Sequence, residues 1–507
     1  MHISEILSRQ NRSSVALLFE ETQFTYGQLD DNANRFANLF KAHGLGAGSR
    51  VSILLGNDPL LIAALFGAFK SGIIANPIHD RLSAGEVRHI LKHAGSRLVV
   101  TNEHHAQTIT DALAEREDPP SVICFGNSGT LKAVAEREFH DQSPTFTDTQ
   151  EVADDDGLLL LYTSGTTGLP KGVLLTHRNL MAGGETVVKR FAIKPTDRTL
   201  CVMPLSHTNG LMFSTIPFLM AGATVALVRR FSASQFWEQC RRYKANSSSL
   251  SPAILAILLE AYKGESLDGI KLDYIKVASA PTSVDLATRF ENQFGSGLLI
   301  ETYGLTETAS VNIGNPVNGQ RKLGSIGTAI PPHQAKIVDE QGNEVARGEV
   351  GEIIINSPCI MKGYFRDPEA TAKILREGWI FSGDLARMDD QGYIFIVGRR
   401  KEIIIRGGEN VSPLEIEQVV CRHPAVREAA AVGYPDDILG EAIGVCVVKW
   451  SDVSERELLE HCKAHLAPFK MPARIVFVDE LPRNAIGKLV RNALLPHLEL
   501  ESNQDHP

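Results

Sequence analysis

Short apolar runs alternate with helical patterns in the first part of the chain, from about Phe24 to Val100. One run spans Val51 to Leu55, and a later one, Leu158 to Tyr162, follows a polar stretch that we interpret as a surface connection. This alternation is typical of an α/β layer in which helices cover a parallel sheet and the strands are buried. We expect the α/β pattern to continue to about Tyr303.

The pattern changes to hairpins between Lys336 and Val397. Glu352 to Ile355 and Tyr393 to Val397 are strand-like, whereas Glu340 to Asn343 has the composition of a turn. These features predict a small antiparallel or barrel-like module.

A mixed region follows Gly398. Ala442 to Lys449 is strand-like, and a helix should begin after Ser454, because Ser454 and Glu457 have capping-box spacing. At 507 residues the chain is too long for one compact core. We place the domain boundary at the basic run 399–401 and predict domains at residues 1–400 and 401–507.

Composition and charge exclude several classes of function. The net charge of −9 gives no basic field for nucleic acid. The sequence has no signal peptide and no apolar stretch of membrane-spanning length, so we expect a cytoplasmic protein. Its seven cysteines are scattered without a C-x-x-C pair, which disfavours a disulfide framework and a thiolate zinc site.

The strongest local signal is a loop of hydroxyls and glycines directly after the run 158–162. It reads Thr163-Ser164-Gly165-Thr166-Thr167-Gly168-Leu169-Pro170-Lys171-Gly172. Backbone N–H and hydroxyl groups can donate to phosphate oxygens, glycines allow close approach, and Lys171 adds positive charge. The loop lacks the Gly-Lys-Ser/Thr ending of a Walker A motif. We predict that it binds phosphate.

Six further motifs follow this loop in chain order. They are Met203-Pro204-Leu205-Ser206-His207, Tyr303-Gly304-Leu305-Thr306-Glu307-Thr308, Ser382-Gly383-Asp384, Gly398-Arg399, Gly407-Gly408-Glu409-Asn410 and Pro482-Arg483-Asn484-Ala485-Ile486-Gly487-Lys488. With these motifs the chain resembles, from about Phe24 to Leu495, the adenylate-forming superfamily. This superfamily contains acyl-CoA synthetases, carrier-loading adenylation domains and firefly-type luciferases.

The resemblance implies both a fold and an activity. The fold is α/β and multidomain, with a large N-terminal domain of two α/β sheet layers plus a small β-barrel-like module, and a small mobile α+β C-terminal domain. The activity is that of an AMP-forming acid:CoA ligase, with ATP, Mg²⁺ and coenzyme A. A small carboxylic acid first becomes an acyl-adenylate with loss of pyrophosphate, and the acyl group then moves to the CoA thiol. Because two anions meet at the α-phosphorus, the site needs cations and hydrogen-bond donors.

The resemblance also assigns residues to the nucleotide. Glu307 would hold the Mg²⁺ ion, which favours one or two carboxylates with phosphates and water. Thr306 would donate to the α-phosphate, and Lys488 would neutralise the substrate carboxylate and the α-phosphate together. The other implied nucleotide residues are Thr163, Ser164, Gly165, Thr166, Thr167, Gly168 and Lys171 in the loop, Tyr303, Ala280 and Pro281 at the adenine, and Asp384 and Arg399 on the ribose or phosphate side.

Further implied roles concern the acid and the second half-reaction. His207 would lie at the carboxylate end of the acid pocket. Ser206 stands where the family commonly has Phe, so gating inferred from relatives does not carry over directly. Lys401 would be the hinge about which the C-terminal domain rotates, and Gly408 would line the pantetheine tunnel, where a residue without a side chain fits.

Alternative functions remain open. An acyl-AMP ligase that loads a separate carrier protein is one, and a non-catalytic acyl or nucleotide sensor is another. Five residues argue against a sensor, which would not need every catalytic group; they are Lys171, Thr306, Glu307, Asp384 and Lys488. The segment 207–212 lacks the aspartate with which adenylation domains usually bind an α-amine.

The acid itself is not identified by the sequence. Segments near Met212, Ser251 to Ala253, Ala278 to Pro281 and Gly304 are expected to line its pocket. They are mostly small or apolar, which favours an uncharged acyl or aryl chain.

Two other signals receive structural interpretations. Gly44 to Gly48 resembles a dinucleotide-binding loop, but it follows a helical pattern and precedes a strand, so we predict a helix-ending turn. The pairs His89 with His93 and His461 with His465 have helical spacing but no third ligand, so we interpret them as solvated helix faces.

Overall fold

The computed structural model describes residues 2–114, 117–126, 135–147, 152–163, 170–483 and 488–499. The chain divides into two compact units. Unit 1 comprises residues 1–282, 286–335 and 355–380, and unit 2 comprises 283–285, 336–354 and 381–507. Residues 381–400 therefore group with the C-terminal part of the chain, whereas the predicted boundary between residues 400 and 401 remains a prediction.

The first sheet of unit 1 has nine strands. Its order is β15 (Thr328–Ala329), β14 (Ile313–Gly314), β13 (Leu299–Tyr303), β12 (Tyr274–Val277), β11 (Ser247–Leu250), β9 (Arg198–Cys201), β10 (Thr224–Leu227), β1 (Val15–Phe19) and β2 (Thr22–Thr25). Neighbours from β13 to β1 are parallel, and antiparallel pairs lie at both ends.

The second sheet of unit 1 has seven strands. Its order is β18 (Gly363–Tyr364), β8 (Lys171–Thr176), β7 (Gly157–Thr163), β4 (Ile74–Pro77), β3 (Arg50–Leu54), β5 (Leu98–Asn102) and β6 (Ser121–Phe125). Strands β7 to β6 are parallel, and β8 and β18 add an antiparallel edge. The strands predicted at 51–55 and 158–162 are β3 and β7, so both are confirmed.

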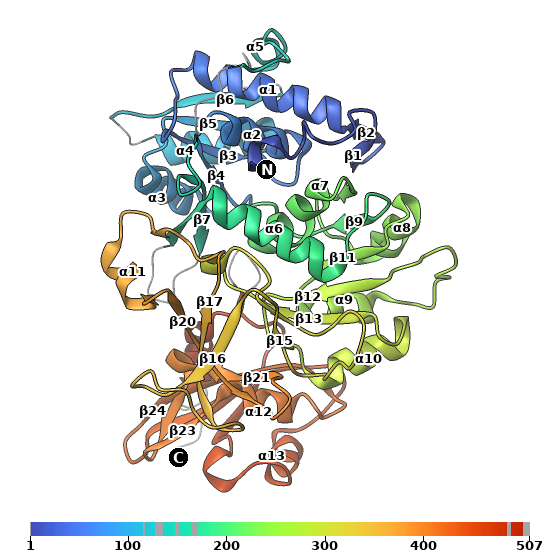
Figure 1. Cartoon of the computed structure of the whole chain (residues 1–507). Coiled ribbons are helices and arrows are strands. Elements are labelled where there is room, and N and C mark those ends of the chain that lie inside the picture. The colour runs from blue at the N-terminus through green and yellow to red at the C-terminus, as the bar shows by residue number, and fades with distance from the viewer. Residues whose placement is uncertain are drawn as a thin grey trace. The chain divides into compact units, whose positions relative to one another are not determined.

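Helices flank these sheets; Figure 1 draws α1 to α10 in blue to yellow-green and α11 in orange. They are α1 (Tyr26–Ala42), α2 (Pro59–Lys70), α3 (Ala84–Ala94), α4 (Ala106–Leu113), α5 (Ala135–His140), α6 (His177–Phe191), α7 (Ile216–Met220), α8 (Ala233–Tyr243), α9 (Pro252–Ala261), α10 (Val284–Phe294) and α11 (Pro368–Ile374). Helix α1 ends before Gly44, whose φ is +71°, and β3 follows, so the predicted helix-ending turn is confirmed.

One apolar core contains side chains from both sheets of unit 1. It includes Val51 of β3, Val225 of β10 and the apolar side chains of α2 such as Leu61 and Phe66, all of them at most 1% exposed. Helix α2 is apolar on nearly every side because it lies within this core.

One lysine is buried in the same region. Lys276 of β12 is fully buried, and its Nζ lies 5.1 Å and 5.0 Å from the ring centroids of Phe191 and Phe218. The Nζ atom has no hydrogen-bond partner in the described part of the chain. Burial lowers the pKa of Lys276 to about 7, because the charged ammonium loses its hydration there.

The first sheet that contributes to unit 2 has five strands and corresponds to the predicted hairpin region. The order is β16 (Gln334–Val338), β17 (Val350–Asn356), β20 (Trp379–Met388) and β19 (Leu375–Arg376), with β21 (Ile394–Arg399) also paired to β20. Strands β20 and β21 are antiparallel, as the pattern predicts.

The C-terminal part of unit 2 is a second five-stranded sheet with helices. The order is β23 (Glu409–Val411), β22 (Ile404–Arg406), β25 (Gly440–Lys449) and β24 (Val426–Asp436), and β26 (Arg474–Phe477) pairs with β25. The helices are α12 (Pro413–Val420), α13 (Glu455–Lys463) and α14 (Leu495–Glu499). Strand β25 and the capping box of Ser454 and Glu457 at the start of α13 confirm both predictions for this region.

The cysteines are free thiols: Cys421 is partly buried and the other six are buried. Burial raises the pKa of Cys201, Cys446 and Cys462 to about 11. It raises the pKa of Cys240, Cys359 and Cys421 to about 12. Among the described residues, no helix combines the length and the apolar character needed to cross a membrane.

Candidate active site

The candidate site of unit 1 lies where the neighbouring parallel strands β9, β11, β12 and β13 end. His207 follows β9, Ala280 follows β12, and Tyr303 ends β13, with Glu307 just beyond it. In open α/β sheets, ligands bind outside the carboxyl ends of the strands. Neighbouring strands therefore bring residues from two motifs and from the 280–281 segment to one edge of the sheet.

Hydrogen bonds join the segments at this edge. The Thr208 hydroxyl donates to Thr306 Oγ1 at 3.2 Å, which links the His207 motif to the Glu307 motif. Asn209 accepts from the Ser249 hydroxyl at 2.6 Å and donates to Ser279 Oγ at 3.3 Å. Asn209 was not predicted from the sequence, because its partners lie 40 and 70 residues away.

The side chain of His207 is held from its own loop. Its Nδ1 accepts from the backbone N–H of Asn209 at 3.2 Å, and its backbone N–H donates to Pro204 at 3.0 Å. Asn209 begins η3 (Asn209–Thr215), which has π-helical hydrogen bonding, a form often found at functional sites.

The turn after β13 requires glycine at position 304. A Cβ atom there would lie 1.9 Å from the carbonyl oxygen of Ser310, which no side chain permits. The half-buried Tyr303 and the exposed Ala280 and Pro281 lie in the two segments that continue β13 and β12.

Two predicted residues, Lys171 and Glu307, contact the same tyrosine. The Nζ of Lys171 lies 5.0 Å from the ring centroid of Tyr364, and the Tyr364 hydroxyl donates to Glu307 Oε1 at 2.7 Å. Burial, followed by the nearby Glu307 carboxylate, raises the pKa of Tyr364, so its hydroxyl stays protonated and donates. Tyr364 was also not predicted, because no local pattern relates it to Glu307.

The centre of the predicted phosphate loop lies outside the described residues. Ser164, Gly165, Thr166, Thr167 and Gly168 belong to this part. The two ends of the loop are described: Thr163 ends β7 and Lys171 begins the antiparallel β8, where they pair in register. The loop therefore connects two strands of a hairpin.

In unit 2, Asp384 and Arg399 form an ion pair. They are opposite each other in β20 and β21, and Arg399 Nε lies 2.8 Å from Asp384 Oδ1. Asp384 is 4% exposed. Glu352 supports this turn: it accepts from the Gly383 N–H at 2.7 Å and pairs with Arg400 at 3.2 Å. Glu352 lies in a predicted strand, but nothing in the sequence marked its partners.

The glycine motif 407–410 is a hairpin turn between β22 and β23. Gly407 and Gly408 have φ values of +59° and +85°, as a two-residue turn of this kind requires. A Cβ atom at Gly408 would meet nothing within 4 Å among the described residues. The positive φ of Gly408, rather than crowding by other described residues, explains why glycine occupies this position.

The predicted hinge and adenylation lysines are both exposed. Lys401 lies in η5 (Arg400–Glu402), immediately after β21. Lys488 follows residues 484–487, which lie outside the described part of the chain. An antiparallel bridge between Arg483 and Leu489 closes the base of this segment.

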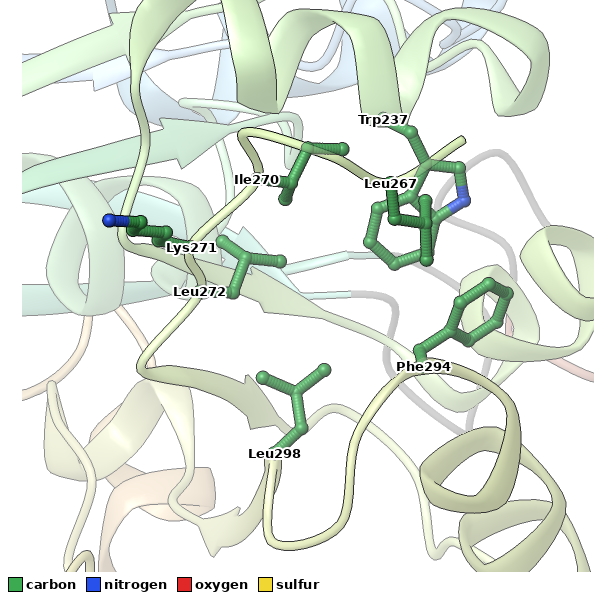
Figure 2. Close-up of a pocket in the computed structure, with 7 residues that line it drawn as sticks. All are labelled: Trp237, Leu267, Ile270, Lys271, Leu272, Phe294 and Leu298. Carbon is green, nitrogen blue, oxygen red and sulfur yellow. The ribbon is translucent and has the colours of Figure 1, made fainter. Parts of the chain in front are cut away.

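A separate cavity of about 140 Å³, lined mainly by residues with apolar side chains, lies in unit 1. Leu298 directly precedes β13 and Leu272 lies two residues before β12, so this cavity is at the amino ends of the strands, opposite the edge that carries His207 and Glu307. Figure 2 shows apolar side chains around it and the Lys271 ammonium directed away from them. Its lining consists of Trp237, Leu267, Ile270, Lys271, Leu272, Phe294 and Leu298.

Two family matches cover most of the chain. Residues 5–365 match the AMP-binding enzyme family, and residues 415–488 match the AMP-binding enzyme C-terminal domain. The chain belongs to the AMP-binding enzyme family. The resemblance to the adenylate-forming superfamily is thereby confirmed.

Curated relatives of this AMP-binding enzyme match nearly its whole length. A sulfoacetate–CoA ligase of Cupriavidus necator is 38% identical over 478 residues, 93% of this chain and 92% of the relative. A crotonobetaine/carnitine–CoA ligase of Salmonella typhimurium is 34% identical, over 94% of this chain and 95% of the relative. A long-chain-fatty-acid–CoA ligase of Mycobacterium tuberculosis is 32% identical, over 94% and 93%.

Solved structures agree in fold. ATP-bound MatB from Rhodopseudomonas palustris has a TM-score of 0.90 at 29% identity, covering 100% of this chain and 99% of that one. The anthranilate CoA ligase AuaEII, in complex with anthranoyl-AMP, has a TM-score of 0.92 at 25% identity, over 99% and 98%. The predicted fold class and the predicted enzyme class, an AMP-forming acyl-CoA synthetase, are confirmed by these similarities.

Proposed function

We propose that this AMP-binding enzyme activates a small carboxylic acid with ATP and transfers the acyl group to coenzyme A. In the first half-reaction a carboxylate oxygen bonds to the α-phosphorus of ATP and the bond to pyrophosphate breaks. In the second, the CoA sulfur bonds to the acyl carbon and AMP leaves. The observation that carries this proposal is similarity to CoA ligases over 93% and 94% of the chain, together with the meeting of two motifs and the 280–281 segment at one strand edge.

Residues of unit 1 would bind the phosphates and the acid. Lys171 and the loop before it supply positive charge and donors for the phosphates, and Thr306 donates to the α-phosphate. Tyr303, Ala280 and Pro281 would contact the adenine. His207 would orient the carboxylate of the acid.

Glu307 fits a Mg²⁺ ion that arrives with ATP. Among the described residues, no group of three or more His, Cys, Asp or Glu side chains is arranged to hold a metal. A single carboxylate suits Mg²⁺, whose remaining ligands would be phosphate oxygens and water. When bound, the ion offsets negative charge on the phosphates. The hydrogen bond from Tyr364 orients Glu307 for this contact.

We expect replacement of Tyr364 by Phe to raise the apparent KM for Mg·ATP. The change removes a hydrogen bond to a carboxylate, which typically contributes about 1.5 kcal/mol, or roughly tenfold. Initial rates of pyrophosphate exchange at several Mg·ATP concentrations measure this. Tyr243→Phe is the matched control, because its hydroxyl donates to the backbone of Glu20, away from the site. An unchanged KM in Tyr364→Phe would rule out the orienting role.

Asp384 would accept hydrogen bonds from the ribose hydroxyls. Its pairing with Arg399 fixes the orientation of the carboxylate. Arg399 would add a further contact on the ribose or phosphate side. Glu352 holds the turn that carries Asp384 through the Gly383 N–H.

The second half-reaction would use a rotation about Lys401 and the glycine turn at Gly408. Lys401→Pro should restrict rotation, because proline fixes φ near −65°. We expect pyrophosphate exchange to persist while thioester formation falls. Lys401→Ala, which keeps the backbone free, should retain both half-reactions. If Lys401→Pro also retained both, the hinge would lie at another residue.

Pyrophosphate exchange with a panel of acids tests the proposed function. The panel should contain short alkanoates and aryl acids. It should also contain sulfoacetate, carnitine, a long-chain fatty acid and anthranilate, because these acids appear in the names of the similar ligases. Acids that support exchange are then offered with CoA or with a carrier protein as acceptor. Formation of a thioester on CoA supports the proposal. If the thioester formed only on the carrier protein, the carrier would be the acceptor in place of CoA. Because ATP and CoA are supplied inside the cell, we also propose a cytoplasmic location.

A further inference from the structure

Arg491 is a largely buried arginine three residues after Lys488, at the start of η7 (Arg491–Leu494). Its side chain is 16% exposed. The guanidinium donates to Glu402 from Nε at 2.7 Å and to Glu417 from both Nη1 and Nη2, the latter at 3.2 Å. Nη1 also donates to the carbonyl of Ala431 at 2.8 Å. One side chain therefore contacts three separate parts of unit 2.

The acceptors connect this arginine to the hinge segment. Glu402 directly follows Lys401 in η5, Glu417 lies in α12, and Ala431 lies in β24. Glu417 also accepts from the Ala431 N–H at 2.8 Å, so α12 and β24 are already joined at this point. Burial disfavours the charged guanidinium, but Glu417 and Glu402 more than offset it, and the pKa of Arg491 is raised.

The segment that carries Lys488 is fixed on its other side as well. The Val490 N–H donates to the Pro482 carbonyl at 2.9 Å, and Leu489 pairs with Arg483. The Arg483 guanidinium contacts Glu428 of β24 at 3.1 Å. Arg483 thus ties the segment to the sheet, and Arg491 additionally ties it to the hinge.

We infer that Arg491 is a positioning residue that makes the Lys488 segment and the hinge segment turn as one rigid body. The inference rests on the proposed function, in which Lys488 acts in adenylation and Lys401 is the hinge. Reaction at the α-phosphorus needs a close and defined geometry, and a misplacement of about 1 Å can cost about 10²-fold in rate. A buried ion pair gives little net stability relative to apolar residues. Positioning therefore explains better than stability why one arginine makes three hydrogen bonds to the two carboxylates of Glu402 and Glu417.

The variant Glu402→Gln tests this inference with little risk to folding. It weakens the contact to the hinge segment only, and the Glu402 side chain is 31% exposed. We expect acid-dependent pyrophosphate exchange to fall about tenfold, the value of one charged hydrogen bond, while thioester formation from supplied acyl-AMP stays within about twofold. Glu415→Gln is the matched control, because Glu415 lies on the same α12 but pairs with Lys470 at 2.7 Å. Arg491→Lys, which loses the bidentate contact, should resemble Glu402→Gln.

A double-mutant cycle separates positioning from general damage. In the Lys488→Ala background, Glu402→Gln should cause no further loss of the residual exchange, because the group that it positions is absent. Additive losses, or equal losses in both half-reactions, would overturn the inference. The inference would also be overturned if Glu402→Gln exchanged pyrophosphate at the wild-type rate while Lys488→Ala alone lost exchange. If instead Lys488→Ala retained full exchange, the proposed role of Lys488 would fail, which is a distinguishable result.

Discussion

Replacement of Lys488 by Ala is expected to lower acid-dependent pyrophosphate exchange by at least about 10²-fold, the usual cost of removing one transition-state donor. The ammonium would neutralise the incoming carboxylate and the α-phosphate when both carry negative charge. Thioester formation from supplied acyl-AMP should be largely retained, because the proposed rotation about Lys401 withdraws Lys488 from the reacting centre during that step. Both half-reactions can be followed separately by isotope exchange and by thioester release.

The control for this variant is an exposed lysine of the same unit. Lys463→Ala, in the last turn of α13, should leave both half-reactions unchanged. Equal loss of adenylation and thioester formation in Lys488→Ala would reject the assigned role. Pyrophosphate exchange at the wild-type rate in Lys488→Ala would also reject this role.

Replacement of Lys276 by Met should stabilise the protein, with the largest gain at or below pH 7. The pKa of this lysine is lowered to about 7, whereas an unfolded lysine titrates near 10.4. Between these values the unfolded chain binds more protons, so wild-type stability rises with pH over this window. The difference between a pKa of about 7 in the folded protein and about 10.4 in the unfolded chain corresponds to about 4 kcal/mol, and the aromatic contacts of the ammonium offset part of this.

Urea unfolding at pH 7 and pH 10 measures this effect. The difference in unfolding free energy between Lys276→Met and wild type should be about 2 to 4 kcal/mol at pH 7 and should shrink towards pH 10. Lys189→Met is the control, because its side chain is 77% exposed; we expect a change within about 0.5 kcal/mol. A less stable Lys276→Met at pH 7 would show that the ammonium is a favourable part of the core.

Local pattern was sufficient to predict several elements of the fold. Strands β3 and β7 follow from short apolar runs, and the start of α13 follows from the spacing of Ser454 and Glu457. Each of these signals lies within a few residues, so neighbouring side chains determine it. The family motifs are also contiguous, which is why they indicated the candidate residues.

Contacts between distant segments were not predictable from these patterns. Tyr364 reaches Glu307 over 57 residues, and Arg491 reaches Glu402 over 89 residues. The order of strands likewise depends on how the whole chain closes its core, since β1 pairs with β10 more than 200 residues later. Such contacts depend on tertiary packing, and no single residue pattern specifies them.

The buried cysteines have a practical consequence for studying this enzyme. A thiolate, rather than a thiol, reacts with disulfide-based colour reagents, and buried thiols with pKa values near 11 or 12 supply very little of it near neutral pH. During the enzymatic reaction such a reagent should therefore measure the free coenzyme A thiol above a low protein background. The consumption of coenzyme A can then be followed over time. Added denaturant would expose seven more thiols per chain, and the same reading would then report unfolding.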